Sequence, residues 1–372
     1  MSAILFILIL SFLVIIHELG HLFAAFWAKI KVEEFGLGYP PVAKKIFTWK
    51  KVPFTLNWVP FGGFVRMAGE EEPEEGTKES EKGMFYASPI GKRLVVILAG
   101  ATVNFVFGVL AFTIIYSFMG IPTMISGARI GYVLPNSPAA QSNIPTKVSI
   151  VKIEAGTESV PISSAQEVIS FVEKHRGQTV TVYTTGPCDD ETCPENLQKF
   201  TTYLRTLEET PKGEGSLGIA FQESVLKFYP WWQMPFRGAA FGLTEALDLG
   251  WTILGALRSL GVNLFTHGAL PSELAGPVGI VHQAHSIGLI GLGIPAIISF
   301  AGQLSINLAI MNVLPIPPLD GGKALFTILE TMISRKRLHR VEYLINYVGY
   351  IFLLGLIIIV TIRDVTRWIF PQ

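Results

Sequence analysis

Residues 6–28 read FILILSFLVIIHELGHLFAAFWA, an apolar run that contains the stretch His17-Glu18-Leu19-Gly20-His21. On a helix, residues four positions apart share one face, so His17 and His21 can bind one Zn²⁺, with Glu18 beside the open coordination position. The same pattern also occurs as a solvated polar patch on ordinary helices. Inside an apolar helix no solvent satisfies these groups, and ionisable side chains in that setting indicate a function. The stretch therefore predicts a zinc site within a membrane span.

The composition is typical of an integral membrane protein with a modest soluble part. Half of the 372 residues are hydrophobic, 16% are charged, and the mean hydropathy is +0.45. The formal net charge is zero, which gives no support to a nucleic-acid partner. The N-terminal run has no basic n-region and no small-residue cleavage site, so it is interpreted as a mature span and not as a signal peptide.

Four stretches are near the length of about 20 apolar residues that a bilayer core demands. The predicted fold class is therefore a multi-span α-helical membrane protein, with transmembrane helices at 1–28 (apolar from residue 2), 94–118, 289–322 (apolar over 289–313) and 342–362. Lys and Arg are concentrated in segments 29–93 and 323–341, and the positive-inside rule makes both cytoplasmic. The N-terminus, the C-terminus and the region between the second and third spans are then extracytoplasmic, in a multi-pass protein of the inner (plasma) membrane.

Residues 31–69 do not read as a solvated loop. The segment is aromatic and rich in Gly and Pro, and KVPFTLNWV (51–59) alternates as a strand does. We predict a small sheet that dips into the membrane beside the active site, where an exposed edge could accept an extended peptide. The alternative is a structural loop packed on the helices.

Residues 123–222 are predicted to form one small extracytoplasmic α+β domain. The helical segment SSAQEVISFVEKHRG begins with Ser163 or Ser164 as its cap, and QTVTVYTT and QKFTTYLRTL pair as strands. Cys188 and Cys193 lie between those strands, and an oxidising compartment favours a disulfide over two free thiols. Residues 230–288 follow as a connector with a long amphipathic helix at the membrane interface, about 234–264.

A second polar constellation, Asn312-Val313-Leu314-Pro315-Ile316-Pro317-Pro318-Leu319-Asp320-Gly321-Gly322, ends the third span. The prolines break the helix and the glycines permit a turn that redirects Asp320. His17 and His21 lie ~24–30 Å along a helix that enters from outside, and Asp320 follows another helix that enters from the same side. The three groups should lie at similar depth, and two His, one carboxylate and a water form a catalytic zinc set.

Two amides accompany this set. Asn312 could hydrogen-bond an extended substrate backbone, or it could be a helix cap or an internal tie. On the second span, Gly100 and Asn104 share one helical face, so Gly100 allows close helix approach while Asn104 faces the polar site.

These motifs together resemble the bacterial site-2 proteases, and most of all the regulator of sigma-E protease group. The resemblance covers nearly the whole chain. It rests on HELGH (17–21), FGGFVRMAGE (61–70), AGATVN (99–104), IGYVLPNSPAA (130–140), AGPVGI (275–280) and NVLPIPPLDGG (312–322).

The resemblance implies that His17, His21 and Asp320 bind Zn²⁺ and that Glu18 is the general base. It also implies a substrate-binding set comprising Asn312 and Pro315 of the LDG motif, Gly62 and Gly63 of a membrane-reentrant β-element, and Asn104. The middle domain is similar to a PDZ domain that filters or gates substrates. The family cleaves single-span membrane proteins, typically anti-sigma factors or remnant signal peptides. The best-known members carry two PDZ domains, whereas 123–222 has room for one.

The sequence thus predicts a zinc-dependent intramembrane endopeptidase whose partners are single-span membrane proteins and the lipid bilayer. It carries no signal for an oligomeric state. Two rivals remain open at this point: a metal-ion or proton transporter that uses an intramembrane His/Asp cluster, and a catalytically silent scaffold that binds membrane proteins.

Overall fold

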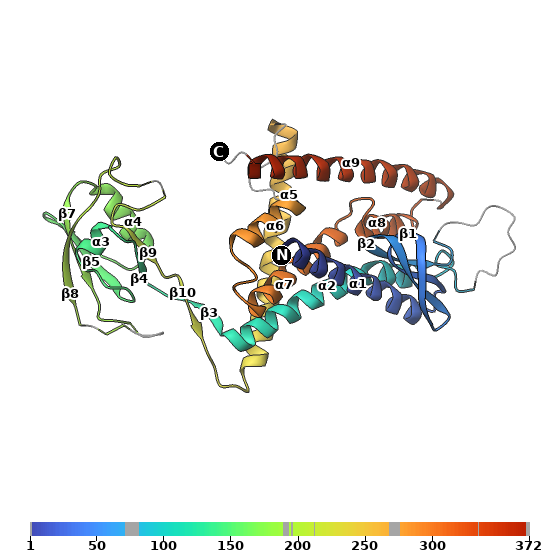
Figure 1. The fold of residues 1–372 in the computed structure, drawn as a ribbon, viewed down its shortest axis with the longest axis horizontal. Helices are drawn as coiled ribbons and strands as arrows, with labels where there is room; N and C mark the ends of the chain where they lie inside the picture. Colours follow the sequence, from blue (N-terminus) through green and yellow to red (C-terminus); the bar gives the residue numbers. More distant parts are fainter. Residues whose placement is uncertain are drawn as a thin grey trace. The chain divides into compact units, whose positions relative to one another are not determined.

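The computed structural model describes residues 2–70, 82–188, 193–194, 196–211, 213–267, 276–333 and 335–369. The chain divides into two compact units, each described by itself (Figure 1). The helical unit comprises Met1–Tyr116 and Pro235–Gln372, and the sheet unit comprises Ser117–Met234.

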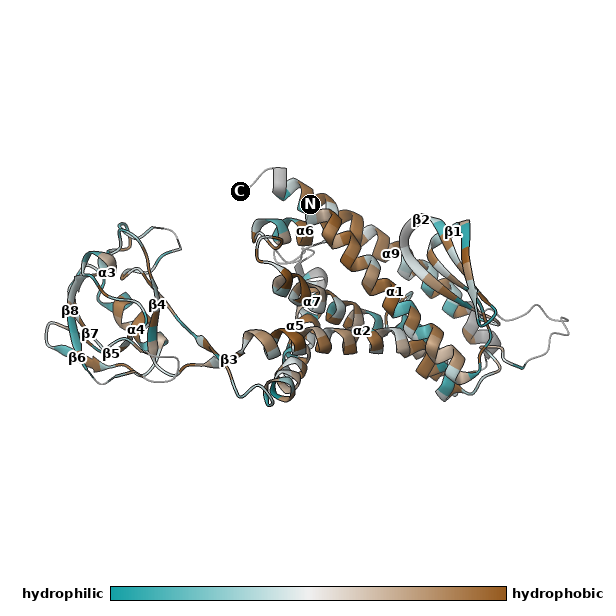
Figure 2. Ribbon diagram, turned by 60° about the horizontal axis from the view of Figure 1, so that its bottom comes forward, coloured by the Kyte–Doolittle hydropathy of each residue, from teal (hydrophilic) through white to brown (hydrophobic). Residues whose placement is uncertain are grey.

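Four helices in the described part of the chain are long and apolar enough to cross a membrane, which confirms the predicted number. They are α1 (Ser2–Ala28), α2 (Ile90–Met119), α7 (Ile294–Val313) and the Val341–Arg367 part of α9 (Arg335–Ile369). Figure 2 shows them brown over most of their length. α7 begins at Ile294 and not at residue 289, because Gly293 has a left-handed backbone (φ 84°) and Pro295 suits a first helical turn.

The predicted loop at 323–341 is instead largely helical. α8 spans Asp320–Leu329, and α9 begins at Arg335, ahead of the apolar span itself. Hydropathy marks residues that are buried in lipid, and it does not register a short amphipathic helix. The third-span segment therefore continues into a second helix that starts at Asp320.

Small residues bring α1, α2 and α7 close together. A Cβ on Gly20 of α1 would lie 2.7 Å from the carbonyl oxygen of Ala99, and one on Gly108 of α2 would lie 2.5 Å from Ile306 of α7. Ser305 Oγ donates a hydrogen bond of 2.7 Å to the backbone oxygen of Asn104, which ties α7 to α2. Close backbone approach of this kind is how helices associate where the solvent is lipid.

α5 (Met234–His267) is one long helix that is not among the four apolar candidates. It packs on the helical unit through a seam of small residues one turn apart: Gly242, Ala246 and Gly250. Ala246 is fully buried in a cluster with Phe112 and Ile306, and a Cβ on Gly242 would lie 2.8 Å from a backbone nitrogen of α2. The opposite face of α5 is exposed and carries apolar side chains such as Leu247 and Trp251 beside the charged Asp248. The interfacial position of this helix stays a prediction.

α9 is fastened to α6 (Pro277–Ser286) by a carboxylate. The backbone N–H groups of Gly276 and Gly279 donate to Asp364 Oδ2 at 2.8 and 2.9 Å. An acidic side chain at a helix N-terminus pairs N–H groups that have no partner within the helix. Only 6% of the apolar window of α9 is buried, and these two hydrogen bonds join α9 to α6.

The predicted sheet at 31–69 is present as β1 (Val32–Trp49) and β2 (Val52–Met67). Both strands fold back on themselves. Phe35 pairs with Phe54 on one side and Val65 on the other, and Phe54 also pairs with Phe47. The result is a four-segment sheet in the order 44–49, 52–57, 32–37 and 63–67, with the last segment at one edge. A row of stacked rings, Phe35–Phe54–Phe47, crosses three of the segments at centroid distances of 4.7 and 4.4 Å.

The sheet unit contains the predicted α+β domain. Its main sheet has the order β8-β7-β5-β4-β9, with β6 paired to β5, while β3 and β10 form a separate two-stranded ribbon. The strands are β3 (Ile121–Met124), β4 (Ala128–Val133), β5 (Ser149–Ala155), β6 (Glu158–Pro161), β7 (Thr179–Thr184), β8 (Gln198–Tyr203), β9 (Ile219–Phe221) and β10 (Ser224–Lys227). The short helix α3 (Pro138–Gln141) and the helix α4 (Ala165–Lys174) complete the unit.

Local details of the sheet unit match the sequence. Ser164 caps α4, since the Glu167 N–H donates to its Oγ, and the Ser163 hydroxyl and backbone N–H donate back to the Glu167 carboxylate. These hydrogen bonds hold the pKa of Glu167 below its usual range. The predicted pairing of β7 with β8 is confirmed, and so is the disulfide Cys188–Cys193.

Candidate active site

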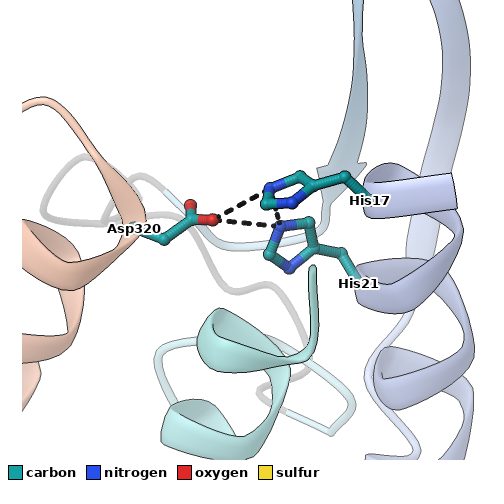
Figure 3. Close-up of side chains that lie close together, drawn as sticks. All are labelled: His17, His21 and Asp320. Atoms are coloured by element: carbon teal, nitrogen blue, oxygen red, sulfur yellow. Dashed lines mark hydrogen bonds and ion pairs between the residues drawn. The ribbon is translucent and has the colours of Figure 1, made fainter. Parts of the chain in front are cut away.

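The three predicted zinc ligands meet at one point in the helical unit. His17 and His21 project from α1, and Asp320 projects from the first position of α8 (Figure 3). Asp320 Oδ2 lies 3.1 Å from His17 Nε2 and 3.3 Å from His21 Nε2, and the two Nε2 atoms are 3.2 Å apart. Both imidazoles are buried. Residues about 300 positions apart thus form one compact donor set.

Asp320 reaches this point because of the turn between α7 and α8. α7 ends at Val313 with Leu314 as its C-cap, and the proline-rich segment 315–319 then leads into α8. A Cβ on Gly321 would lie 2.1 Å from the Leu314 carbonyl oxygen, and one on Gly322 would lie 2.8 Å from the Pro317 nitrogen. Only glycine fits at these two positions, so the LDGG sequence is required by the close return of the backbone.

The far end of α8 is fixed by an ion pair that the sequence analysis did not find. Arg93 of α2 donates two hydrogen bonds to Glu330, with Nη1–Oε2 at 2.5 Å and Nη2–Oε1 at 2.6 Å. Both side chains are largely buried, which favours a defined bidentate geometry. α8 is therefore held at both ends, and its orientation sets the position of Asp320.

Each imidazole is oriented by a group on α2. His21 Nδ1 donates a hydrogen bond of 2.8 Å to the Val96 carbonyl oxygen, so in the neutral ring the lone pair of Nε2 faces Asp320. His17 Nδ1 lies 3.3 Å from Asn104 Nδ2, and Asn104 Oδ1 has no partner within the described residues. If the Asn104 side-chain amide is rotated by about 180°, Oδ1 takes the place of Nδ2 and accepts the hydrogen bond from His17 Nδ1. Metal-binding histidines have this arrangement, with the second ring nitrogen donating to an oxygen.

The donor set fits zinc. With both Nδ1 atoms protonated, two imidazole lone pairs and a carboxylate oxygen converge, and three acceptors at this separation need a cation between them. A tetrahedral zinc with ligand bonds of about 2.0–2.1 Å has edges of about 3.3–3.4 Å between its ligands. The three distances of 3.1, 3.2 and 3.3 Å match that figure closely. Two histidines and one carboxylate also leave the fourth position for water or substrate.

Glu18 lies between the metal ligands and the sheet. A Cβ on Gly63, in the edge segment 63–67, would lie only 3.2 Å from Glu18 Cγ. Glu18 lines two cavities, of 740 and 250 Å³, and His17, Tyr39, Gly63 and Asp320 line both of them as well. The general base that the sequence predicts is therefore next to the metal ligands and accessible from two sides.

The structure brings most of the other predicted site residues to the same place. Asn312, Gly62, Gly63 and Asn104 all line the 250 Å³ cavity. Pro315 is not among the described residues that line it, whereas the neighbouring Pro318 and Leu319 are. Asn104 is 1% exposed and contacts His17, which favours an orienting role over direct contact with substrate.

Replacing Asn104 by Ala should weaken zinc binding, because the His17 ring would lose the group that fixes its orientation. Loss of such a partner lowers metal affinity by about 10–100-fold. Titration of the purified protein with a competing chelator measures this affinity. Asn104→Asp keeps an acceptor oxygen and should retain most of the zinc affinity. Equal zinc affinities for wild type and Asn104→Ala would show that Asn104 does not orient His17.

An H-E-x-x-H helix that shares its metal site with a carboxylate from a second helix, within a set of apolar helices, defines a membrane-embedded zinc metalloprotease. Peptidase family M50 matches residues 5–356, so the chain belongs to that family. The chain is 26% identical to a protein of Agrobacterium fabrum that is provisionally named a zinc metalloprotease, with 98% of this chain and 95% of that protein covered.

Two further relatives also match over nearly the whole length of both chains. A Clostridium acetobutylicum protein with the same provisional name is 29% identical, over 96% of each chain. The regulator of sigma-W protease RasP of Bacillus subtilis is 26% identical, over 98% of each chain. The protein is accordingly a zinc metalloprotease of the site-2 type in the inner (plasma) membrane.

Proposed function

We propose that this enzyme cleaves single-span membrane proteins within their transmembrane segments, with anti-sigma factors or remnant signal peptides as substrates. One observation carries the proposal: Glu18 and the converging His17, His21 and Asp320 lie on or against an apolar helix long enough to span the membrane. The name of RasP, a regulator of sigma-W protease, supports a substrate of the sigma-factor regulatory kind.

The residues of this chain suit peptide hydrolysis. Zinc bound by His17, His21 and Asp320 would supply a Lewis acid that activates water and polarises the scissile carbonyl. Glu18 accepts the proton of the attacking water on its carboxylate and delivers it to the leaving amine nitrogen. Asn312 lines the 250 Å³ cavity, which supports a role in hydrogen-bonding the substrate backbone beside the cleaved bond.

The substrate would bind as a strand along segment 63–67 of the four-segment sheet. This segment pairs with residues 32–37 on one side, and it passes Glu18 at Gly63. An extended peptide can add to such an edge through main-chain hydrogen bonds. A transmembrane helix must unwind locally to bind in this way, so segments with weak helix propensity should be preferred.

The topology proposed from the basic loops puts both termini and the sheet unit outside the cytoplasm, with the active site towards the cytoplasmic side. The disulfide in the sheet unit supports an oxidising compartment. In this arrangement the sheet unit acts as a PDZ-like filter that keeps bulky extracytoplasmic substrates away.

Replacement of Glu18 by Gln tests this function. Purified wild type and Glu18→Gln are reconstituted in liposomes with a membrane-spanning reporter, and zinc is measured in both. We expect the variant to retain zinc and to cleave the reporter about 10²–10⁴-fold more slowly, because it lacks the proton acceptor. Cleavage by both proteins, or by neither, would contradict the mechanism, and metal flux without cleavage would indicate a transporter.

A further inference from the structure

A separate cavity of 590 Å³ lies at the end of α1 and shares no lining residue with the two cavities of the metal site. It is bounded by the end of α1, by residues 29–31 and by the segment 82–89 that leads into α2. Lys29, Lys31 and Lys82 belong to its lining, whereas no acidic residue of the described chain does. The cavity is therefore a basic pocket within the helical unit.

Backbone hydrogen bonds fix the wall of this pocket. The Lys29 N–H donates to the Phe26 oxygen at 3.1 Å, which closes the last turn of α1. The Lys31 N–H donates to the Gly83 oxygen at 2.9 Å, and the Lys31 oxygen accepts from the Ala68 N–H at 2.9 Å. Segments far apart in sequence are thus joined around the pocket, and the lysines project from a fixed frame.

Lys29, Lys31 and Lys82 are all exposed, and none of them forms an ion pair with another residue of the described chain. Lys29 also has a left-handed backbone (φ 62°) at the end of α1, a position where glycine is common and unstrained.

The position of the pocket along α1 places it among lipid headgroups. α1 is a candidate span, and the pocket begins at its last residues. Trp27 is 64% exposed next to it, and Trp49 packs edge-on against Phe26 at a centroid distance of 5.5 Å. Exposed tryptophans at the end of a span are typical of the membrane interface. With the topology proposed above, this is the cytoplasmic leaflet, whose anionic lipids attract basic residues.

We propose that this pocket binds the phosphodiester headgroup of an anionic lipid of the cytoplasmic leaflet. The ammonium groups of Lys29, Lys31 and Lys82 contact the phosphate oxygens, and the acyl chains run along Phe26 and the exposed face of Trp27. The bound lipid then bridges the end of α1 and the start of α2, the two helices that carry and orient the zinc-binding histidines.

Native mass spectrometry of the full-length chain with dioleoylphosphatidylglycerol tests the site. The variant Lys29→Gly/Lys31→Gln/Lys82→Gln removes the three charges, and its glycine relieves the strained backbone of α1. The matched control Lys44→Gln/Lys45→Gln/Lys51→Gln removes three exposed charges from β1 and the turn that follows it. All proteins also carry Glu18→Gln, so that lipid binding is read independently of proteolysis.

We expect the protein with all three pocket lysines to bind dioleoylphosphatidylglycerol more tightly than dioleoylphosphatidylcholine. Affinity should fall by about five-fold for each lysine removed, or about 100-fold for all three, and the control should keep wild-type affinity. Equal binding by all three proteins, or no discrimination against phosphatidylcholine, would overturn the proposal. If inorganic phosphate displaces the lipid at equal concentration, the ligand is a free anion and the lipid assignment is wrong.

Discussion

Alanine at position 100 is expected to remove zinc from the protein and abolish proteolysis. A Cβ on Gly100 would lie 2.5 Å from His21 Nε2 and 2.7 Å from His17 Nε2, the atoms that converge on the metal. Carbon and nitrogen need about 3.5 Å between them, and both rings are held on the other side by Val96 and Asn104. Loss of a hydrogen bond that supports a metal ligand lowers affinity or activity by up to about 100-fold. We expect the zinc affinity and the cleavage rate of Gly100→Ala each to fall further than that.

Elemental analysis and the reporter assay measure this effect, with Gly108→Ala as the control. Gly108 lies two turns further along α2, where a Cβ would press on the flexible end of Ile306 at 2.5 Å. That variant should lose some stability but keep its zinc and its activity. Normal zinc content in Gly100→Ala would show that the imidazoles can move aside, and the close packing would then not be required for the site.

The second large effect is expected from Asp320→Asn. The change keeps the shape of the side chain and removes the negative charge that attracts the cation, so one of the three proposed protein ligands is lost. Zinc affinity should fall by at least about 100-fold, and cleavage should be undetectable without added zinc. A chelator titration followed by the reporter assay measures both quantities.

Asp364→Asn is the matched control for Asp320→Asn. Asp364 is also a buried carboxylate of the helical unit, but it accepts hydrogen bonds from Gly276 and Gly279 and lies outside the metal site. We expect it to loosen α9 without changing zinc affinity. If both variants lose zinc equally, the loss reflects general destabilisation and Asp320 is not shown to be a ligand.

The sequence predicts the metal-binding residues better than it predicts the residues that hold them in position. His17 and His21 are four residues apart on a helix, so their shared face follows from helical geometry alone. Asp320 is about 300 residues away, and only the orientation of the spans relates it to the histidines. That argument holds because a membrane restricts helices to two directions, and the structure brings the three groups within 3.3 Å of one another.

What the sequence does not predict depends on tertiary contacts. Val96 acts through its backbone oxygen, so its residue type carries no signal. Arg93 and Glu330 look like ordinary loop charges until α8 brings them together. The folding of β1 and β2 into four segments is equally hidden, because alternation of apolar residues marks a strand but not the side on which its partner lies.

The separation between the two halves of the donor set also determines when the enzyme becomes active during its own synthesis. His17 and His21 leave the ribosome before Asp320 and the helix that carries it, which follow about 300 residues later. At about 5–20 residues per second, the interval is roughly 15–60 s. During that time the nascent chain holds only two of its three proposed metal ligands, and neighbouring membrane proteins are exposed to no competent protease. Synthesis of the roughly 300 residues between His21 and Asp320 therefore acts as a built-in delay on proteolysis.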